Sequence, residues 1–403
     1  MVQMKNLPKG WEWRRLREIT DEIQTGFAFG AFDKSIGVIH LRPYNITKDG
    51  RFLLNELKYV PDDSIKSEKY LLGKGDLIFN STNSEELVGK TAIFNDNLKC
   101  TFSNHITKIR FNGKIANPYY MWILFNFYYR IGKFKPMLKR WVNQVGVEIN
   151  RLKELEILLP PLPTQQKIVS ILERAERLKQ RREQTNDETN KIIQSLFYEM
   201  FGDPILNLKN FPKTKLGSVS DISMGGTPNT GIKEYYENGN INWMKSGDIK
   251  DDFIKYVPHK ITELGLKNSN TKIYKKGNVV IALNGQGKTR ATTGILGVDT
   301  ASNQSVASIS PKNKIKAEYL HFNLKVRYKQ LRGLTGDEQR SGLNLTILRN
   351  LEIPIPPISL QSQFASLVEK IESIKQKQTK STADINTLFD ALMQKAFQGE
   401  LIA

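Results

Sequence analysis

The sequence repeats itself at about half its own length. Residues 155–173, LEILLPPLPTQQKIVSILE, return 196 residues later as LEIPIPPISLQSQFASLVE at residues 351–369. The same offset pairs Phe201 with Phe397 without a gap. Repetition at this spacing indicates that the chain of 403 residues consists of two similar halves. Each half contains a globular region, a proline-rich stop and a long helix, as expected of a protein that contacts one target twice.

The positive charge is shared evenly between the two halves. The net charge is +19, of which residues 1–202 carry +9 and residues 203–403 carry +10. A basic tail would concentrate the excess at one end, whereas an even excess indicates two faces presented to one polyanion. Nucleic acid is the polyanion that such a surface most often binds.

Cysteine and histidine usage argues against several kinds of protein. Cys100 is the only cysteine, so the sequence predicts no internal disulfide and no cysteine-based metal cluster. The four histidines lack the spacing of metal ligands. No apolar signal segment opens the sequence, and no stretch approaches the length of a membrane span. We therefore expect a cytoplasmic protein with no membrane segment, no metal and no cofactor of its own.

The globular part of each half contains short β-rich runs before a helix. Residues 76–79 are matched by 278–281, and the helix begun by Asn117 and Pro118 is matched by residues 317–322. The pattern predicts an α+β chain with a pseudo-twofold internal repeat, in which two similar α/β domains are joined by two long antiparallel coiled-coil helices. The expected boundaries are 1–159 for the first domain, 160–202 for its long helix, 203–355 for the second domain and 356–403 for its long helix.

A long helix follows the proline-rich stop in each half. Thr164 offers an N-cap after the last proline, and no proline or glycine follows until Gly202. Each helix should run about 37 residues, or roughly 55 Å. Apolar or small residues at alternating spacings of three and four predict a coiled-coil seam in both helices. The expected seam residues are Ile168, Ile171, Ala175, Leu178, Ile192 and Leu196 in the first helix, and Phe364, Leu367, Ile371, Ile374, Ile385, Leu388 and Leu392 in the second.

The seam alone leaves the direction of helix pairing open. Parallel and antiparallel pairing both place the polar middle of one helix, at Arg182 and Thr185, against the polar middle of the other, at Gln378 and Ser381. Antiparallel pairing is the arrangement that places two related domains at opposite ends of the helices, and we expect it for that reason.

One segment fits a loose phosphate-binding pattern. Residues 282–289, ALNGQGKT, match the Walker A spacing and follow a strand-like run. The next residues, 290–297, contain β-branched threonines and glycines, which favour a turn and a strand over the helix that a P-loop needs. A P-loop nucleotide-binding enzyme is therefore an alternative interpretation, and a basic glycine-rich loop that contacts nucleic acid is the preferred one.

A second segment is similar to a methyltransferase motif. Residues 117–120, NPYY, are similar to the N-P-P-Y/F tetrapeptide that holds a target nitrogen, but the second proline is missing. A proline-started helix explains the segment without chemistry. The sequence shows no Ser/His/Asp arrangement, no nuclease-like cluster of carboxylates with lysine and no pair of catalytic carboxylates. We therefore expect no catalytic residues.

Three loops in each half carry polar and basic residues among glycines. They are residues 25–34, 80–90 and 139–150 in the first half, and 224–233, 284–292 and 332–344 in the second. Asn, Gln, Arg and Lys can read base edges, and Lys and Arg can hold phosphates. The candidate DNA-binding residues are Lys90, Lys139, Arg140, Asn143, Gln144, Gln286, Lys288, Arg290, Arg332 and Arg340.

Taken together, these features resemble a specificity subunit of type I restriction–modification systems. The repeated L-E-I-x-x-P-P-x-x-x-Q block, the paired basic regions and the GQGKTR loop carry the resemblance, which covers the whole chain. The endings AFQGEL at 396–401 and MFGDP at 200–204 are also similar to that family. The resemblance implies two target-recognition domains that each read half of a split double-stranded DNA site, with the helices setting the spacing.

The same resemblance implies the partners and their cofactors. The helices would bind two modification (methyltransferase) subunits, and restriction or translocase subunits would join the complex. S-adenosylmethionine and ATP would bind those partner subunits, and the chain itself would be non-catalytic. Dissimilar loops on a common frame predict an asymmetric target. A coiled-coil scaffold without DNA specificity is the remaining alternative.

Overall fold

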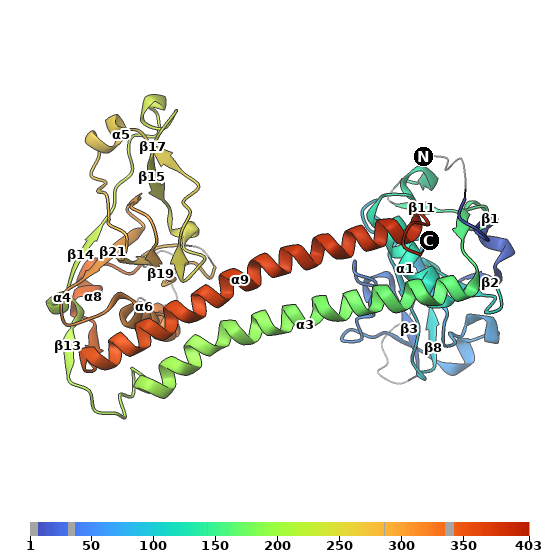
Figure 1. Cartoon of the computed structure of the whole chain (residues 1–403), viewed down its shortest axis with the longest axis horizontal. Helices are drawn as coiled ribbons and strands as arrows, with labels where there is room; N and C mark the ends of the chain where they lie inside the picture. Colours follow the sequence, from blue (N-terminus) through green and yellow to red (C-terminus); the bar gives the residue numbers. More distant parts are fainter. Residues whose placement is uncertain (1–6, 31–36, 143, 286, 335–341, 403) are drawn as a thin grey trace. The chain divides into compact units, whose positions relative to one another are not determined.

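The computed structural model describes residues 7–30, 37–142, 144–285, 287–334 and 342–402. The chain divides into two compact units. The first unit comprises Met1–Arg181 and Ser381–Ala403, and the second comprises Arg182–Lys380. Each unit therefore contains one globular domain and one half of each long helix (Figure 1).

The first domain contains a four-stranded sheet of order β2-β9-β5-β7. Its strands pair antiparallel throughout. A second sheet of order β4-β3-β8 contains one parallel pair, β3 with β8. Smaller sheets pair β1 with β12 and order β10-β11-β6. The elements are β1 Glu12–Arg15, β2 Thr20–Thr25, β3 Val38–Leu41, β4 Tyr59–Val60, β5 Leu77–Asn80, β6 Thr82–Asn83, β7 Thr91–Ile93, β8 Cys100–Phe102, β9 Ile106–Phe111, α1 Pro118–Arg130, β10 Leu138–Arg140, β11 Val145–Val147, α2 Ile149–Lys153 and β12 Glu156–Leu159.

The second domain repeats this topology. Its main sheet has the order β14-β21-β18-β19-β16, so its first four strands match β2-β9-β5-β7, and the sheet β17-β15-β20 matches β4-β3-β8 down to the parallel pair. The pair β13 and β22 matches β1 and β12. The elements are β13 Lys213–Lys215, α4 Leu216–Val219, β14 Ser220–Met224, β15 Ile241–Met244, β16 Phe253–Ile254, β17 Lys260–Ile261, α5 Glu263–Lys267, β18 Val279–Ala282, β19 Thr293–Leu296, β20 Ala301–Ser302, β21 Val306–Pro311, α6 Ala317–Val326, α7 Tyr328–Gly333, α8 Leu345–Asn350 and β22 Glu352–Pro354.

One helix in each domain covers the main sheet. The predicted start of α1 is confirmed: the Asn117 side chain caps it by accepting hydrogen bonds from two N–H groups of the first turn, and Pro118 is its first residue. Tyr120 and Phe125 of α1 pack with the strand residues Phe79 and Ile109 in one buried core. In the second domain α6 occupies the same place and supplies Tyr319, Leu320 and Phe322.

The long helices α3 Leu162–Phe201 and α9 Ile358–Phe397 are unbroken and equal in length (Figure 1). α3 begins two residues before the predicted N-cap at Thr164. The reason is that Pro163 is accommodated inside the first helical turn, where its missing N–H removes no helical bond. The main-chain N–H of Thr164 donates to Pro161 O at 2.8 Å.

The helices pair in the antiparallel direction, as expected. Within the first unit, Ile168 and Leu172 of α3 share a core with Phe389 and Met393 near the end of α9. Within the second unit, the end of α3 shares a core with the start of α9, where the Phe197 and Phe364 rings lie 5.7 Å apart.

The predicted seam is confirmed for the residues spaced seven apart from Ile168 and from Phe364, which are buried or partly buried. It is wrong for the predicted residues between them. Ile168, Ala175 and Phe364 are buried, and Leu196, Ile371, Ile385 and Leu392 are partly buried. The buried positions between them lie one residue later than predicted; they are Leu172, Ile193, Val368 and Phe389. Leu178, Ile192, Leu367, Ile374 and Leu388 are instead exposed, and Ile171 is only partly buried.

The glutamine of each repeated P-P-x-x-x-Q block joins a long helix to its domain. Gln165 is fully buried, and its Nε2 donates to Pro160 O at 2.8 Å and to Ile115 O at 2.9 Å. Its Oε1 accepts from the Asn117 N–H at 2.7 Å, directly before α1. Gln361 makes the equivalent three bonds in the second unit. The motif therefore fixes the start of each long helix to the domain helix that covers the sheet.

Candidate nucleic-acid interface

The predicted loops of the first domain meet at one edge of its main sheet. Strands β2 and β5 both end there, at Thr25 and Asn80, because each runs antiparallel to β9 and pairs with its first residues. The segment around β11 joins this edge through the Val147 N–H, which donates to Ser81 O at 2.9 Å. The described residues of this loop edge are 26–30, 81–90, 103–105, 139–142 and 144–147.

The second domain gathers its loops in the same way. Strands β14 and β18 end at Met224 and Ala282, beside the start of β21. The Leu283 N–H donates to Ser305 O at 2.8 Å, and the Leu343 N–H donates to Leu283 O at 2.9 Å. The described residues of this second loop edge are 225–233, 283–285, 287–292, 303–305, 332–334 and 342–344. Each domain thus presents one continuous set of polar loops.

Three candidate residues of the second domain lie in one cluster. The Tyr328 hydroxyl donates to Lys288 O at 2.7 Å and accepts from Arg332 Nη1 at 3.3 Å. The same Arg332 nitrogen donates to Arg290 O at 3.2 Å. Arg332 therefore holds the glycine-rich loop in place, while the side chain of Lys288 is exposed. In the first domain the Tyr129 hydroxyl makes the matching bond to Glu86 O at 2.6 Å.

The hairpin β10–β11 presents candidate residues of the first domain. Lys139 pairs with Glu148 at 2.5 Å, and Arg140 pairs with Glu85 at 2.6 Å, which ties the hairpin to the loop after β5. Gln144 is exposed, and its main-chain O accepts a hydrogen bond from the Trp141 N–H at 2.8 Å. At least two cations of this edge are therefore partly neutralised by carboxylates.

Lys90 does not belong to this surface. Its side chain is buried, and Nζ donates to Pro43 O at 3.2 Å and to Ile46 O. Burial lowers the pKa of Lys90, and the nearby Lys48 lowers it further. The residue ties β7 to the second sheet, so its assignment as a DNA contact was wrong. The candidates Asn143, Gln286 and Arg340 lie outside the described residues.

The Walker-like segment lacks the architecture of a P-loop. Residues 287–291 form turns that lead into strand β19, where a P-loop would open a helix. Ala291 has a φ of +67°, a conformation that a helical first turn does not use. The segment therefore connects two antiparallel strands, and the nucleotide-binding interpretation gains no support.

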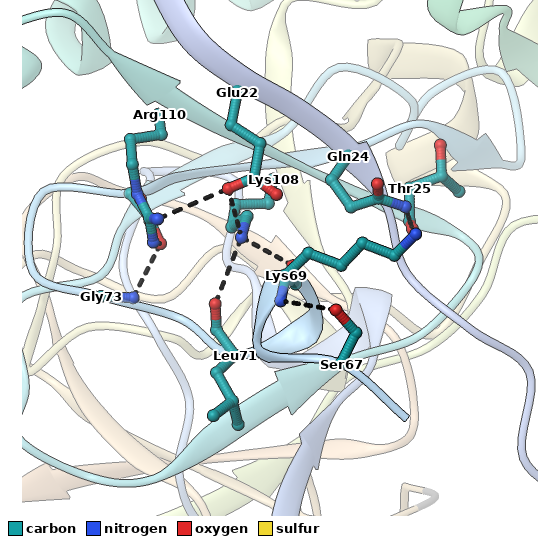
Figure 2. A network of polar contacts seen from close by, with 10 residues as sticks. Glu22, Gln24, Thr25, Ser67, Lys69, Leu71, Gly73, Lys108 and Arg110 are labelled. Carbon is teal, nitrogen blue, oxygen red and sulfur yellow. Dashed lines mark hydrogen bonds and ion pairs between the residues drawn. The ribbon is translucent and has the colours of Figure 1, made fainter. Parts of the chain in front are cut away.

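A buried ion network supports the main sheet of the first domain (Figure 2). Lys108 is fully buried, and its Nζ lies 2.9 Å from Glu22 Oε2 while it donates to Lys69 O at 2.7 Å. Arg110 binds Asp76 through two bonds of 2.7 and 2.8 Å. In the second domain the strand position of Lys108 is taken by Ser308. The two domains therefore share a frame and differ in the polar groups that fill it.

The second domain contains a different polar chain. Thr293 Oγ1 lies 3.1 Å from His321 Nδ1, and His321 Nε2 lies 2.9 Å from Asp252 Oδ1, which Lys325 also contacts. Burial alone would raise the pKa of Asp252, but His321 and Lys325 outweigh it and hold that pKa well below its usual range. His321 is fully buried, so this polar network anchors α6 to the sheet, while Asp252, Thr293 and Lys325 line a pocket of about 310 Å³.

The long helices carry apolar side chains that their own pairing leaves exposed. In the first unit these side chains are Leu178 of α3 and Leu388 of α9. Each lies directly before a residue of one helix–helix contact, in which Lys179 Nζ lies 5.7 Å from the centre of the Phe389 ring. In the second unit, Ile374 and Ile192 occupy the repeat-related positions. All four are about half exposed, at 49–55%. We name these two pairs the first and second helix patches.

Sequence reasoning missed two polar residues of the second loop edge. Thr227 lies within the predicted loop 224–233, and its hydroxyl donates to Gln304 Oε1 from the turn between β20 and β21. The turn carried no glycine or basic signal, so only the strand pairing brings it to this edge. Within the described residues, no helix has the length and apolarity to span a membrane, and no acidic, histidine and cysteine side chains cluster as metal ligands would.

Comparisons with known proteins agree with this architecture. A family model described as the type I restriction modification DNA specificity domain matches residues 8–190 and 209–385. The putative type I restriction enzyme MjaX specificity subunit of Methanocaldococcus jannaschii is 25% identical over 424 residues, which cover 99% of this chain and 96% of that protein.

Two solved structures show the same fold. One comes from a study of complex assembly and conformational transition of the type I R-M system. It has a TM-score of 0.65 at 20% identity, and the match covers 98% of this chain and 100% of that chain. The HsdS subunit from Thermoanaerobacter tengcongensis has a TM-score of 0.51 at 21% identity, with 99% of both chains covered.

Proposed function

Because the chain belongs to the family of type I restriction modification DNA specificity proteins, we propose that each of its domains reads one half of a split DNA site. The chain is the DNA-recognition subunit of a restriction–modification complex. The observation that carries the finer assignment is the repeated loop edge, which the same strand topology builds in both units from different residues. Different loops on one frame should read different sequences, so the target is asymmetric.

We infer that two modification subunits dock on the two helix patches. Large apolar side chains that stay half exposed along a helix are typical of a surface completed by another helix. The repeat places one patch in each unit, which supports two equivalent docking positions. A shallow groove of about 360 Å³ next to Ile192, lined by α3 residues, adds to the second patch.

Native mass spectrometry of the chain with its modification subunit tests the docking. The pair Leu178→Glu and Leu388→Glu should remove one of two bound subunits, and Ile192→Glu with Ile374→Glu should remove the other, because charge at the patch opposes burial. The control is Gln184→Glu with Gln394→Glu, which adds the same charge at exposed positions outside the patches. Two bound subunits in both patch variants would contradict the assignment.

We further propose that catalysis belongs to those partners. S-adenosylmethionine and ATP would bind the modification and the restriction or translocase subunits, and the complex would act in the cytoplasm. The absence of a helix after the Walker-like loop and the burial of His321 support a non-catalytic chain. Methylation of DNA by the purified chain alone would overturn this proposal.

The paired helices should set the spacing between the half-sites. Inserting four residues after Thr185 and four after the repeat-related Ser381 lengthens both helices by about one turn, or roughly 5.4 Å. Because B-DNA advances roughly 3.4 Å per base pair, the preferred gap should widen by about one to two base pairs. An unchanged gap would show that the helices do not set the spacing.

A further inference from the structure

Gln304 occupies an exposed position on the second loop edge. It lies in the turn between β20, which ends at Ser302, and β21, which begins at Val306. The turn faces a cleft of about 660 Å³ whose lining includes Gly226, Thr227, Asn270, Lys272 and Gln304. The side chain is therefore presented beside polar and cationic groups at the edge where the other predicted DNA loops meet.

The loop after β14 approaches this turn so closely that it requires glycine. A Cβ on Gly225 would lie 2.0 Å from Ser302 O, and a Cβ on Gly226 would lie 2.8 Å from the main-chain N of Thr271. The Gly226 N–H donates to Ser302 O at 2.9 Å, which fixes the loop against the turn. This approach places the next residue, Thr227, beside Gln304.

The Thr227 hydroxyl orients the carboxamide of Gln304. It donates to Oε1, which leaves a second lone pair on that oxygen and both hydrogens on Nε2 for other partners. An oriented carboxamide offers one acceptor and one donor side by side. That pair matches the N6 donor and N7 acceptor that adenine shows in the major groove, and it matches no other base as a bidentate contact.

We propose that Gln304 reads one adenine in the half-site of the second domain and that Thr227 is its positioning residue. This inference rests on the proposed function and names one reading group within it. The first domain has Asn104, also exposed, at the equivalent turn, where the Gly26 Cβ position would lie 2.1 Å from Phe102 O. Ala28 replaces Thr227 there, so the turn of the first domain carries a shorter amide side chain, and the residue at the position of Thr227 has no hydroxyl to orient it.

The test is binding of the assembled complex, with its modification subunits, to a duplex library. Gln304→Ala should lose discrimination for adenine at one position of one half-site by on the order of 10- to 100-fold, the range of one bidentate pair. Gln304→Glu cannot donate to N7 and should shift the preference at that position toward cytosine, whose N4 donates to a carboxylate. Both substitutions are at an exposed residue, so folding should be retained.

Two further variants separate reading from support. Thr227→Val should relax the same single position by a smaller factor, and Thr227→Ser should restore it because the hydroxyl returns. Asn104→Ala must leave the second half-site unchanged, as must Asn268→Ala, which removes an exposed amide at the end of α5.

The outcomes distinguish this proposal from the proposed function. A selective wild-type complex whose preferences stay the same in Gln304→Ala, or weaken equally for all sequences, overturns the reading role alone. A wild-type complex without sequence preference overturns both. The expected result is a loss of adenine preference at one position in Gln304→Ala and Thr227→Val. Thr227→Ser should keep that preference.

Discussion

The side chain of Gln165 accepts a hydrogen bond from the main-chain N–H of Asn117, with 2.7 Å between the two heavy atoms. Gln165 lies in the first turn of the long helix α3 and donates to two further carbonyls, so one amide joins three segments. Its repeat partner Gln361 binds the Lys316 N–H at 2.9 Å in the second unit. The most recognisable part of the repeat is therefore a structural joint between helix and domain.

Loss of this joint should destabilise one unit and leave the other unaffected. Gln165→Leu leaves the buried Pro160 carbonyl without its donor and removes two further, partly buried hydrogen bonds, so we expect a loss of about 1–3 kcal/mol in the first unit. Hydrogen exchange with mass spectrometry should show faster exchange in α1 and β12, with the second unit unchanged. Gln361→Leu should show the reverse, and the exposed neighbour Gln166→Leu should change neither. Equal effects on both units would contradict independent joints.

The ion network of the first domain predicts a second asymmetry. Lys108→Met should cost about 1–3 kcal/mol, because it removes the buried donor of the Lys69 carbonyl, while Glu22 keeps Arg110 as a second partner at 3.4 Å. The double variant Lys108→Met with Glu22→Gln should recover part of that loss, since it reduces the negative charge that Lys108 no longer balances. Unfolding free energies from urea titration provide the measurement. A double variant less stable than Lys108→Met would show that Arg110 alone balances the charge of Glu22.

His40 predicts a stability that depends on pH. Burial, with a smaller effect of Arg42, lowers the pKa of His40 to about 4. The unfolded chain binds the proton near its ordinary pKa of about 6.5, so stability falls as the pH drops below that value. The loss should be about 2 kcal/mol at pH 5, while above pH 7 the residue contributes no pH dependence.

The variant His40→Phe measures this contribution. Its first unit should lose about 2 kcal/mol less than the wild type between pH 7 and pH 5. Some pH dependence should remain, because burial also lowers the pKa of His105. Hydrogen exchange in β3 at the two pH values reads out the first unit directly. Identical pH dependence in variant and wild type would mean that His40 takes up its proton without unfolding.

Lys288 should act as a phosphate contact. Its side chain is exposed on the second loop edge, while its carbonyl is held by Tyr328. Lys288→Ala should weaken binding to all sequences and reduce the slope of log affinity against log salt by about one unit. Lys276→Ala, at the opposite end of β18, is the matched control. Relaxed preference at one base position would instead identify Lys288 as a reader.

The helix seam shows what the sequence could and could not predict. Phe364 was predicted correctly because its neighbours, Gln363 and Ala365, are polar or small and leave one large apolar choice. At the intervening positions two neighbours are often both apolar, as with Ile192 and Ile193, and only the paired structure decides between them. Lys179 takes a seam position that Leu178 was expected to fill, because its ammonium lies over the Phe389 ring.

For the loop edges, too, the sequence could predict some features and not others. Glycine and basic residues predicted which loops were candidates, and the repeat predicted that both domains would have them. The burial of Lys90 could not be predicted, since its carbonyl partners come from a loop more than forty residues away in sequence. Gln304 carried no local signal, because strand pairing alone brings its turn beside Thr227.

The central claim is that the two domains read two different halves of one DNA site. Mapping of methylated sites in cells that express this chain with its modification subunit tests it most directly. We predict a single split motif with two unlike halves, in which loop-edge substitutions of the second domain, such as Gln304→Ala, alter only one half. An undivided motif, or a second-domain variant that alters both halves, would contradict the account.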